Sequence, residues 1–400
     1  MSRRLLVFVL VTLVAGGALA AGIAVAGKDQ GNNKNFKYAV GLWGDLPYSD
    51  VQAQTGVPNL IADMNNSDIA FSVHDGDLKA GSAIPGSVTP TTCQSAVQPS
   101  IYSQALGYFN SLDKPAMFTP GDNDWTDCDR TINGPFNSLE RLQYERGFLF
   151  STDESFGRHP MELEVQTAPL CQGSTQADGS QRFLTGCVEN RRWTFHEVTF
   201  ATLNVQGTCN NLCSSGAGDP GGDVPEYTAR EAADEAWLRE TFDEAKDKDS
   251  AAVMIIWQAD PGFDTSGYQG APCRDPKTLE EKVKNAAGVC TTTASMTDGF
   301  HDILSALRDQ TIAFEKPVVL VHGDSHYFMV DKPLLDSSGR RVENFTRVET
   351  FGDHAFGSAH PEWDTNDVDW VKALVDPKSR DVFAFQPQIV PANRVAVPSP

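Results

Sequence analysis

The sequence predicts a layered α/β fold, and three observations support this prediction. Apolar runs of strand length recur along the chain. Segments with helical periodicity separate these runs, which favours a largely parallel or mixed sheet with helices on its faces. Stretches rich in Ser, Thr, Gln and Gly interrupt the alternation, and cysteines lie within them. Such stretches are typical of surface insertions.

The strand-like runs are short and apolar, and the helical segments lie mostly between them. We expect strands at 38–43, 69–73, 116–119, 194–205 (a hairpin-like pair), 252–257, 317–321, 346–351 and 381–385. We expect helices at 58–64, 100–112, 226–246 and 298–308. The third helix is the clearest, because Ala233, Trp237, Leu238 and Phe242 fall on one face. The expected insertions are 81–99, 169–186 and 207–225.

The N-terminal segment predicts export. Arg3 and Arg4 precede an unbroken run of apolar and small residues from Leu5 to Ala26, with small residues at two candidate cleavage sites. This layout is typical of a signal peptide at residues 1–26. An uncleaved anchor is the alternative, since the run is long enough to span a bilayer. In both cases we expect the protein to be secreted, periplasmic or held at the cell surface.

The rest of the chain predicts a polar linker at 27–36, one large domain at 37–390 and a tail at 391–400. The formal charge of −21 argues against contact with nucleic acid or anionic lipid. We therefore expect no nucleic-acid-binding surface and no membrane contact beyond the leader. The oligomeric state stays open.

Eight cysteines in an exported chain favour disulfides over free thiols. Their spacing favours pairing between neighbours, although many other pairings exist. A zinc–thiolate site is the alternative, but the chain has no C-x-x-C pair. The expected pairs are Cys93–Cys128, Cys171–Cys187, Cys209–Cys213 and Cys273–Cys290.

Polar ligands follow five of the strand-like runs directly. In an α/β sheet, the carboxyl ends of the strands form the edge at which ligands bind. Each Gly-Asp alone is most often an ordinary turn or cap, but acid-bearing turns after five strand-like runs in succession favour a shared site. Carboxylates gathered without neighbouring cations repel one another, and divalent metal ions relieve that repulsion. The segments are Gly44-Asp45, His74-Asp75-Gly76-Asp77, Gly121-Asp122-Asn123-Asp124, Gln258-Ala259-Asp260 and His322-Gly323-Asp324-Ser325-His326.

The order and spacing of these segments resemble the calcineurin-like metallophosphoesterases over about Tyr38 to Phe385. That family has D-x-H, G-D, G-N-H-[DE], a lone His and G-H-x-H in this order. The corresponding segments here are Asp45-Leu46-Pro47, Gly76-Asp77, Gly121-Asp122-Asn123-Asp124, Gln258 and Gly323-Asp324-Ser325-His326. The resemblance implies a central β-sandwich of mixed sheets flanked by helices. It also points to a secreted bacterial branch with a degenerate metal-ligand signature.

The resemblance implies a dinuclear metal site. Asp77 would bridge two divalent cations, and Asp45 and His326 would bind the first. Asp122, Gln258 and Asp324 would bind the second. Carboxylates in place of imidazoles favour harder ions, so we expect Mn²⁺ or Mg²⁺, with Ca²⁺, Fe or Zn²⁺ as alternatives.

Two departures from the family pattern concern function directly. Pro47 cannot ligate through its side chain, and Asn123 stands where the family has a proton-donating histidine. Asn123 can still contact phosphate, and Lys79 is a further candidate for binding a phosphate oxygen or else a solvated loop lysine. His74 and His322 are candidate replacement acids, or else packed side chains at strand ends.

The resemblance implies an extracytoplasmic phosphoric ester hydrolase acting on a small-molecule or macromolecular ester with metal-activated water. The alternative is a binding protein of the same fold without hydrolase activity. A glycosidase with paired carboxylates is a weaker reading, because glycine–acid turns suit ions better. A serine hydrolase is excluded by the lack of a G-x-S-x-G motif.

Overall fold

The computed structural model describes residues 37–168, 170–172, 184–212, 222–263, 272–285, 289–291, 298–352 and 368–393. The predicted leader and the whole of the predicted linker lie outside this part, as do residues 394–400 of the predicted tail. In the described part, no helix combines the length and the apolar character needed to cross a bilayer.

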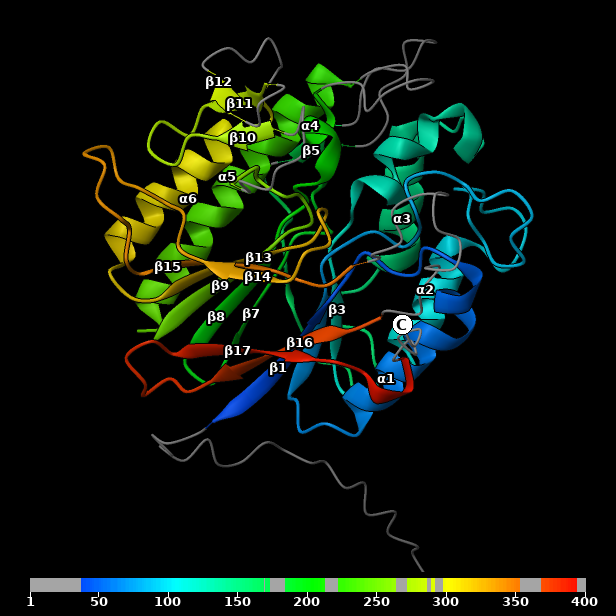
Figure 1. Cartoon of the computed structure of the whole chain (residues 1–400), viewed down its shortest axis with the longest axis horizontal. Helices are drawn as coiled ribbons and strands as arrows, with labels where there is room; N and C mark the ends of the chain where they lie inside the picture. The colour runs from blue at the N-terminus through cyan, green and yellow to red at the C-terminus, as the bar shows by residue number, and fades with distance from the viewer. Residues whose placement is uncertain are drawn as a thin grey trace, which may run out of the picture. The chain divides into compact units, whose positions relative to one another are not determined.

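Two mixed β-sheets form the centre of the domain (Figure 1). In the first, β1, β2 and β3 are parallel, and β16 and β17 add antiparallel strands beside β1. Its order is β17 (Phe383–Gln388), β16 (Trp370–Val375), β1 (Tyr38–Trp43), β2 (Phe71–His74) and β3 (Ala116–Phe118).

The second sheet has parallel strands β8, β9, β13 and β15 at its centre and antiparallel strands at its edges. Its order is β14 (Met329–Asp331), β15 (Phe345–Glu349), β13 (Val318–His322), β9 (Ala252–Ile256), β8 (Val198–Thr202), β7 (Arg191–Phe195) and β4 (Glu164–Val165). Two small sheets accompany it: β5 (Leu170–Gln172) with β6 (Leu184–Gly186), and β10 (Pro272–Arg274), β11 (Glu281–Lys284) and β12 (Cys290–Thr291).

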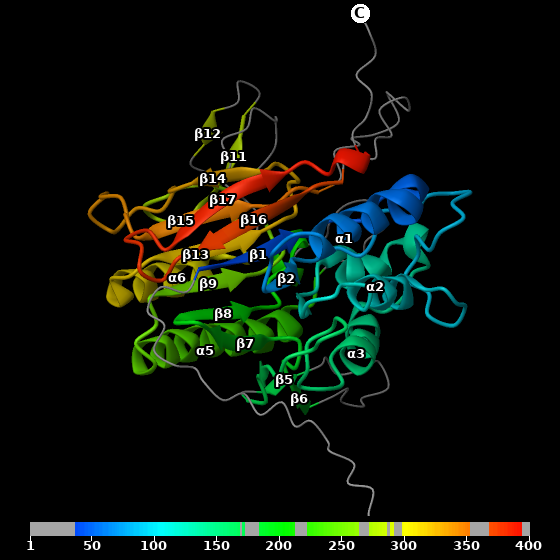
Figure 2. The same ribbon diagram turned by 90° about the horizontal axis from the view of Figure 1, so that it is seen from below.

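Three apolar cores show that the two sheets stack face to face with helices outside (Figures 1 and 2). Side chains of both sheets, such as Val40 and Met254, share the middle core. The outer face of the first sheet packs on α1 (Val57–Asn65) and α2 (Ile101–Phe109), with α3 (Ser138–Leu149) beside them. The outer face of the second packs on α5 (Val224–Asp247) and α6 (His301–Phe314).

The predicted layered α/β fold is therefore confirmed, with mixed sheets flanked by helices. The predicted helices correspond to α1, α2, α5 and α6, and the predicted hairpin corresponds to β7 and β8. The prediction did not include α3 or β16. Helix α3 escapes the apolar pattern because Arg141, Glu145 and Arg146 are buried in it alongside its leucines.

Two predicted disulfides are present in the described part. Cys93–Cys128 and Cys171–Cys187 have Cα separations of 5.6 and 5.3 Å. The other two predicted pairs include the side chains of Cys213 and Cys290, which lie outside the described residues. Cys93–Cys128 joins the first predicted insertion to the turns that follow β3.

Candidate metal centre

The carboxyl ends of strands from both sheets meet at one edge of the sandwich. Within the first sheet, the Asp45 amide donates to the Gly76 carbonyl (2.9 Å), which joins the turns after β1 and β2. Between the sheets, the amide of Asp324 donates to Asp45 Oδ2 (3.1 Å). The turns after β1, β2 and β13 therefore lie directly against one another.

Several acids in this cluster adopt left-handed backbone conformations. The φ values are 51° at Asp45, 62° at Asp77 and 74° at Asp324, and His326 has a φ of 68°. Residues with a side chain rarely adopt such angles unless surrounding contacts impose them, and they concentrate at functional sites. The left-handed backbone of these turns therefore directs their carboxylates into the cluster, although a turn without left-handed residues would end a strand with less strain.

Glycines allow the carboxylates to approach the backbone closely. A Cβ atom on Gly121 would lie 2.0 Å from Asp77 Oδ1, and one on Gly323 would lie 2.0 Å from Asp45 Oδ2. Neither position has room for a side chain. Gly121 and Gly323 therefore leave space for an acid that follows a different strand.

The acids are buried and carry little compensating charge. Asp45 is fully buried, and Asp77 and Asp122 are 2% and 7% exposed. Among the described residues, the one basic side chain within 4 Å of these acids or of Asp324 is His326, whose Nε2 lies 3.6 Å from Asp45 Oδ1. Burial, followed by repulsion from Asp122 and Asp45, holds the pKa of Asp77 well above its usual range.

The same effect acts on the other sheet. Burial and then the Asp122 carboxylate raise the pKa of Asp324 well above its ordinary value. A buried acid, Asp77, and a half-buried acid, Asp324, thus have raised pKa values beside further carboxylates, and a divalent cation would stabilise their ionised forms.

One half of the cluster lies around Tyr48. Its hydroxyl donates to Asp77 Oδ2 at 2.6 Å and lies 3.5 Å from Asp45 Oδ1. The Asn123 side-chain amide donates to the Tyr48 hydroxyl (3.0 Å), and the Tyr48 ring meets the His326 ring edge-on at 5.2 Å. Tyr48 thus contacts all three residues predicted to bind the first cation.

The other half lies around Asp122. Gln258 Nε2 donates to Asp122 Oδ1 (3.1 Å), and the Thr208 hydroxyl donates to Asp122 Oδ2 (2.8 Å). Gln258 Oε1 accepts from the Gly207 amide at 2.6 Å. The Asp260 amide donates to Asp324 Oδ2 (3.0 Å). The residues predicted to bind the second cation are therefore gathered here.

The donor set fits hard divalent cations, because carboxylate and amide oxygens are the ligands that such ions prefer. Protein hydroxyl and amide groups lie between the carboxylates. In the described part, accordingly, no three of the predicted acids and His326 offer ligand atoms that all lie within 4.8 Å of one another. The one group that meets this spacing, Cys171, Cys187 and Glu189, contains a disulfide and is not a metal site.

Asn123 and Lys79, the predicted phosphate-binding residues, both lie beside Asp77. The Asn123 backbone amide donates to Asp77 Oδ1 (3.1 Å). Lys79 is only 1% exposed, and its Nζ donates to the Ala80 carbonyl (2.9 Å). Burial lowers the pKa of Lys79 to about 8, although Asp127 and other nearby carboxylates oppose this shift. Lys79 is thus a buried charge rather than a solvated loop lysine.

The two candidate proton donors are packed beneath the cluster. His74 Nδ1 accepts from the Gly76 amide (3.2 Å), and its ring meets Trp43 edge-on at 4.5 Å. His322 Nδ1 lies 2.9 Å from the Gly323 carbonyl oxygen. Burial lowers the pKa of His74 to about 4 and also lowers that of His322, so both rings are neutral at pH 7. Neither ring is therefore charged and ready to donate a proton at that pH.

Sequence reasoning missed two residues of the site. Tyr48 follows Asp45 by three positions, so its place in the first turn was a usable signal. Thr208 comes from a predicted insertion, and nothing in its local sequence points to Asp122. Its contact with Asp122 depends on the tertiary fold, which brings Thr208 to the turn after β3.

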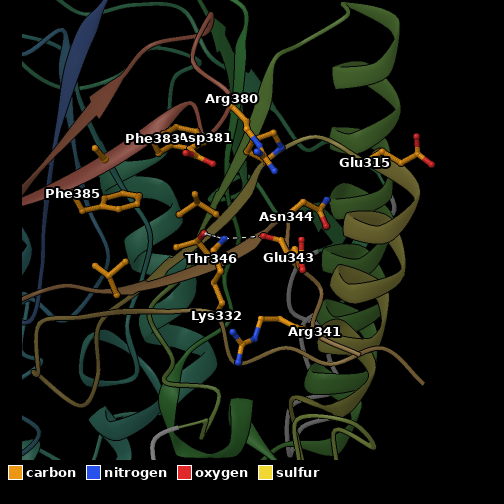
Figure 3. Close-up of a pocket in the computed structure, with 14 residues that line it drawn as sticks. Glu315, Lys332, Arg341, Glu343, Asn344, Thr346, Arg380, Asp381, Phe383 and Phe385 are labelled. Atoms are coloured by element: carbon orange, nitrogen blue, oxygen red, sulfur yellow. Dashed lines mark hydrogen bonds between the residues drawn. The ribbon is translucent and has the colours of Figure 1, made fainter. Parts of the chain in front are cut away.

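A separate hollow of about 830 Å³ lies at the other ends of the strands (Figure 3). Pro317 and Val319 line it at the start of β13, whereas Asp324 follows the end of that strand. Lys332 lies within it, and its Nζ donates to Thr346 Oγ1 (2.8 Å) and to two carbonyls. This hollow is therefore not part of the acid cluster.

Comparisons with known proteins give structural likenesses only. No family model matches the sequence, and no curated protein matches it. Among solved structures, GAP50, the anchor in the inner membrane complex of Plasmodium, is similar with a TM-score of 0.41 and 10% identity, over 88% of this chain and 89% of that one.

Two nucleotidases give similar values. The 5'-nucleotidase of Candida albicans has a TM-score of 0.39 and 10% identity over 87% of this chain. The NAD nucleotidase of Haemophilus influenzae has the same score and identity over 89% of this chain. This chain spans about half the length of each nucleotidase, with 50% of each covered.

Proposed function

We propose that this chain is an extracytoplasmic, metal-dependent phosphoric ester hydrolase of the calcineurin-like class, from a secreted bacterial branch. One observation carries the proposal: buried Asp45, Asp77 and Asp122 converge with half-buried Asp324 in a cluster in which His326 is the one basic group within 4 Å among the described residues. Buried carboxylates that repel one another are costly unless cations neutralise them.

The residues divide into two halves that share Asp77. Asp45 and His326 would hold one cation, and Asp122, Gln258 and Asp324 would hold the other. When bound, Mn²⁺ or Mg²⁺ ions would supply positive charge for phosphoryl oxygens and would activate a water molecule. Asn123 already lies beside Asp77 and would orient a phosphate oxygen through its amide.

A second candidate is a binding protein of the same fold without hydrolase activity. The observation that favours it is the set of protein donors that already satisfy the carboxylates. Tyr48 and Asn123 donate to Asp77, and Gln258 and Thr208 donate to Asp122. Carboxylates that already accept hydrogen bonds from protein groups are less destabilised when no cation is bound.

Hydrolysis of para-nitrophenyl phosphate and of its bis-ester separates the two candidates. The leaderless, oxidised protein is treated with chelator and then supplied with Mn²⁺, Mg²⁺, Ca²⁺ or Zn²⁺. We expect turnover restored by Mn²⁺ or Mg²⁺ and abolished in Asp77→Asn. Asp243→Asn is the matched control, because that side chain is 73% exposed in α5.

Turnover that is absent with every ion, in a protein that is folded and binds Mn²⁺, would support the non-catalytic candidate. Turnover that resists chelation and persists in Asp77→Asn would contradict both candidates, because neither provides a route without this cluster.

A further inference from the structure

The segment labelled α4 (Gly207–Asn211) is a left-handed turn rather than an ordinary helix. Thr208, Cys209, Asn210 and Asn211 have φ values of 52°, 51°, 56° and 66°. Side chains make this conformation unfavourable, and a run of four such residues without glycine requires strong external support. The turn follows β8 and lies beside Asp122.

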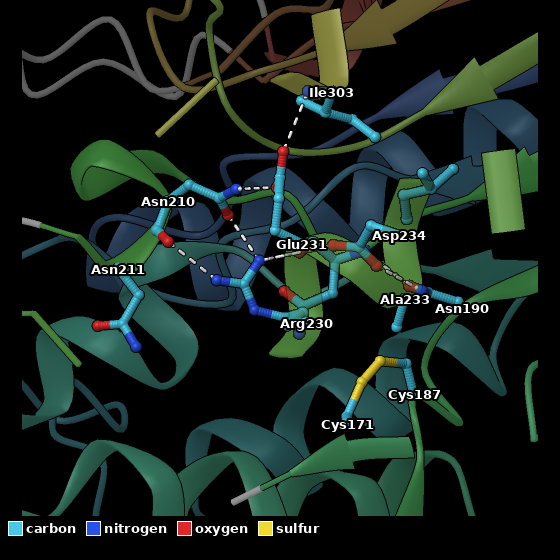
Figure 4. A network of polar contacts seen from close by, with 12 residues as sticks. Cys171, Cys187, Asn190, Asn210, Asn211, Arg230, Glu231, Ala233, Asp234 and Ile303 are labelled. Carbon is cyan, nitrogen blue, oxygen red and sulfur yellow. Dashed lines mark hydrogen bonds and ion pairs between the residues drawn. A yellow bond between two sulfur atoms is a disulfide. The ribbon is translucent and has the colours of Figure 1, made fainter. Parts of the chain in front are cut away.

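A buried arginine supplies much of that support (Figure 4). Arg230, fully buried in α5, donates to Asn210 Oδ1 (2.6 Å), to the Asn210 carbonyl (2.9 Å) and to the Asn204 carbonyl (2.7 Å). Glu226 balances its charge, with Oε1 lying 2.7 Å from Arg230 Nε. The guanidinium is therefore committed to holding the turn.

Two acids of α5, Glu226 and Glu231, also hold the turn directly. The Asn211 side chain donates to Glu226 Oε2 (2.7 Å), and the Asn210 side chain donates to Glu231 Oε2 (3.0 Å). Glu231 also accepts from the Ile303 amide (3.0 Å), which links the turn to α6. Together these contacts hold the unfavourable backbone conformation in place. Helices α5 and α6 therefore fix the position of the turn.

The first two residues of this turn, Gly207 and Thr208, contact the half of the cluster that surrounds Asp122. Thr208 Oγ1 lies 2.8 Å from Asp122 Oδ2 and 3.2 Å from Asp127 Oδ1. A hydroxyl has one proton, and the shorter distance favours its donation to Asp122. Gly207 donates to Gln258 and has no room for a side chain, since a Cβ would lie 2.6 Å from Asp122 Oδ2.

We infer that Thr208 is a positioning residue for a divalent cation bound by Asp122. The inference rests on the proposed function, since it assumes that Asp122 is a cation ligand. Gln258 holds one oxygen of the Asp122 carboxylate and Thr208 holds the other, so the plane of the carboxylate is set before an ion arrives. Groups that orient a metal ligand in this way usually contribute about 10- to 100-fold to metal affinity.

Mn²⁺ binding to the full-length exported protein, freed of metal, tests the inference. Isothermal titration gives the affinity of each binding event, and electron paramagnetic resonance shows whether two ions sit close enough to couple. Thr208→Val replaces the hydroxyl with a methyl group, and valine is β-branched like threonine, so the backbone preference at this position changes little. Thr208→Ser restores a hydroxyl at the same position.

In Thr208→Val we expect one Mn²⁺ event to weaken about 10- to 100-fold while the other is unchanged. The coupled signal should be lost, and the urea midpoint of the metal-free protein should fall, because a hydrogen bond to a carboxylate is lost. Thr208→Ser should bind as the parent does. Thr241→Val is the control, because its buried hydroxyl donates to the Trp237 carbonyl (2.7 Å) in α5, outside the acid cluster.

Two results would overturn the inference, and they have different consequences for the proposed metal site. If the parent binds two ions and Thr208→Val binds both equally well, the role of Thr208 is wrong and the metal site stands. If the parent binds no Mn²⁺ at all, the inference and the proposed function fall together.

Discussion

Tyr48 shows how a neutral side chain can take the place of a cation among carboxylates. Its hydroxyl donates to Asp77 and approaches Asp45, and it receives a hydrogen bond from Asn123. Burial and the neighbouring Asp77 carboxylate raise the pKa of Tyr48 well above its usual value, so the phenol keeps its proton. In the metal-free protein this proton separates two acids that a metal ion would otherwise hold together.

Tyr48→Phe should therefore destabilise the metal-free protein and strengthen Mn²⁺ binding. Loss of a hydrogen bond to a charged group costs about 1.5–3 kcal/mol. The variant has no hydroxyl to displace, so its affinity should rise about tenfold, which corresponds to about 1.4 kcal/mol. Urea unfolding with chelator and Mn²⁺ titration measure the two effects.

Tyr108→Phe is the control for this experiment. Its hydroxyl donates to the Ala53 carbonyl (2.7 Å), so the change should lower stability slightly and leave Mn²⁺ affinity unaltered. Weaker Mn²⁺ binding in Tyr48→Phe would contradict the competing role and would make the phenol oxygen a ligand instead.

At the level of single elements, the turns after the strands position the acids more than the strands do. Asp124 accepts from the amides of Asp77 (3.1 Å) and Gly121 (2.8 Å), so the turn after β3 holds the turn after β2. The two turns touch so closely at Gly121 that neither can move alone. The geometry at Asp77 is therefore a property of two segments at once.

Gly121→Ala should displace Asp77 and disturb cation binding more than overall folding. The new Cβ would lie 2.0 Å from Asp77 Oδ1 and 2.5 Å from its backbone nitrogen, so the turn must shift. We expect Mn²⁺ affinity to fall by about tenfold or more, as for other changes that misplace a ligand. Mn²⁺ titration and the far-ultraviolet spectrum check this expectation.

Gly107→Ala provides the opposite case. Gly107 lies in α2, and a Cβ there would meet nothing within 4 Å. The change should stabilise the protein by about 0.5–1 kcal/mol, because glycine is costly inside a helix, and should leave Mn²⁺ binding as it was. Equal Mn²⁺ affinity in both glycine variants would show that the packing at Gly121 does not set the site.

At the scale of the whole molecule, the fold gathers buried carboxyl groups at one edge of the sandwich, where their ionised forms are unfavourable. Burial raises the pKa of Asp124 to about 7 and, together with repulsion from Asp122, raises that of Asp127 to about 8. Stability in the metal-free protein then depends on protons that these buried carboxyls retain. A cation would remove that dependence, because it favours the ionised carboxylates.

Metal-free protein should lose stability as the pH rises from about 6.5 to 8. The folded state keeps protons on Asp124 and Asp127 that the unfolded chain has released, so their contribution is present at low pH and disappears as the pH passes 7 and 8. Each such proton contributes up to about 1.4 kcal/mol per pH unit. The lowered pKa of His74 opposes this trend only below about pH 6.5, and that of Lys79 only above about pH 8.

Urea unfolding across this range, with chelator and with Mn²⁺, measures the trend. Asp127→Asn should flatten it, because the amide does not titrate, and Mn²⁺ should flatten it in the parent. A stability that rises over the same range in chelator would show that the cluster is not held by protons.

Much of the fold could be predicted from local patterns. The apolar runs of β1, β9 and β13 and the apolar face of α5 were readable because burial imposes its period directly on the sequence. Helix α3 was not readable, because Arg146 is buried in an ion pair with Glu189 (2.6 Å) that lies far away in the chain. A buried charge satisfied by a distant partner looks like a surface residue in the sequence.

The sequence by itself determined which acids follow which strands, since a glycine–acid turn after an apolar run is a local feature. Local patterns therefore suffice to name Asp45, Asp77, Asp122 and Asp324. Only the tertiary structure decided what lies between them. Thr208 reaches Asp122 across 86 residues because Arg230 clamps a left-handed turn, and the hydroxyl of Tyr48 reaches Asp77 because two strands are adjacent. Such contacts depend on the relative placement of distant segments, which burial of the three cores fixes and no local pattern records.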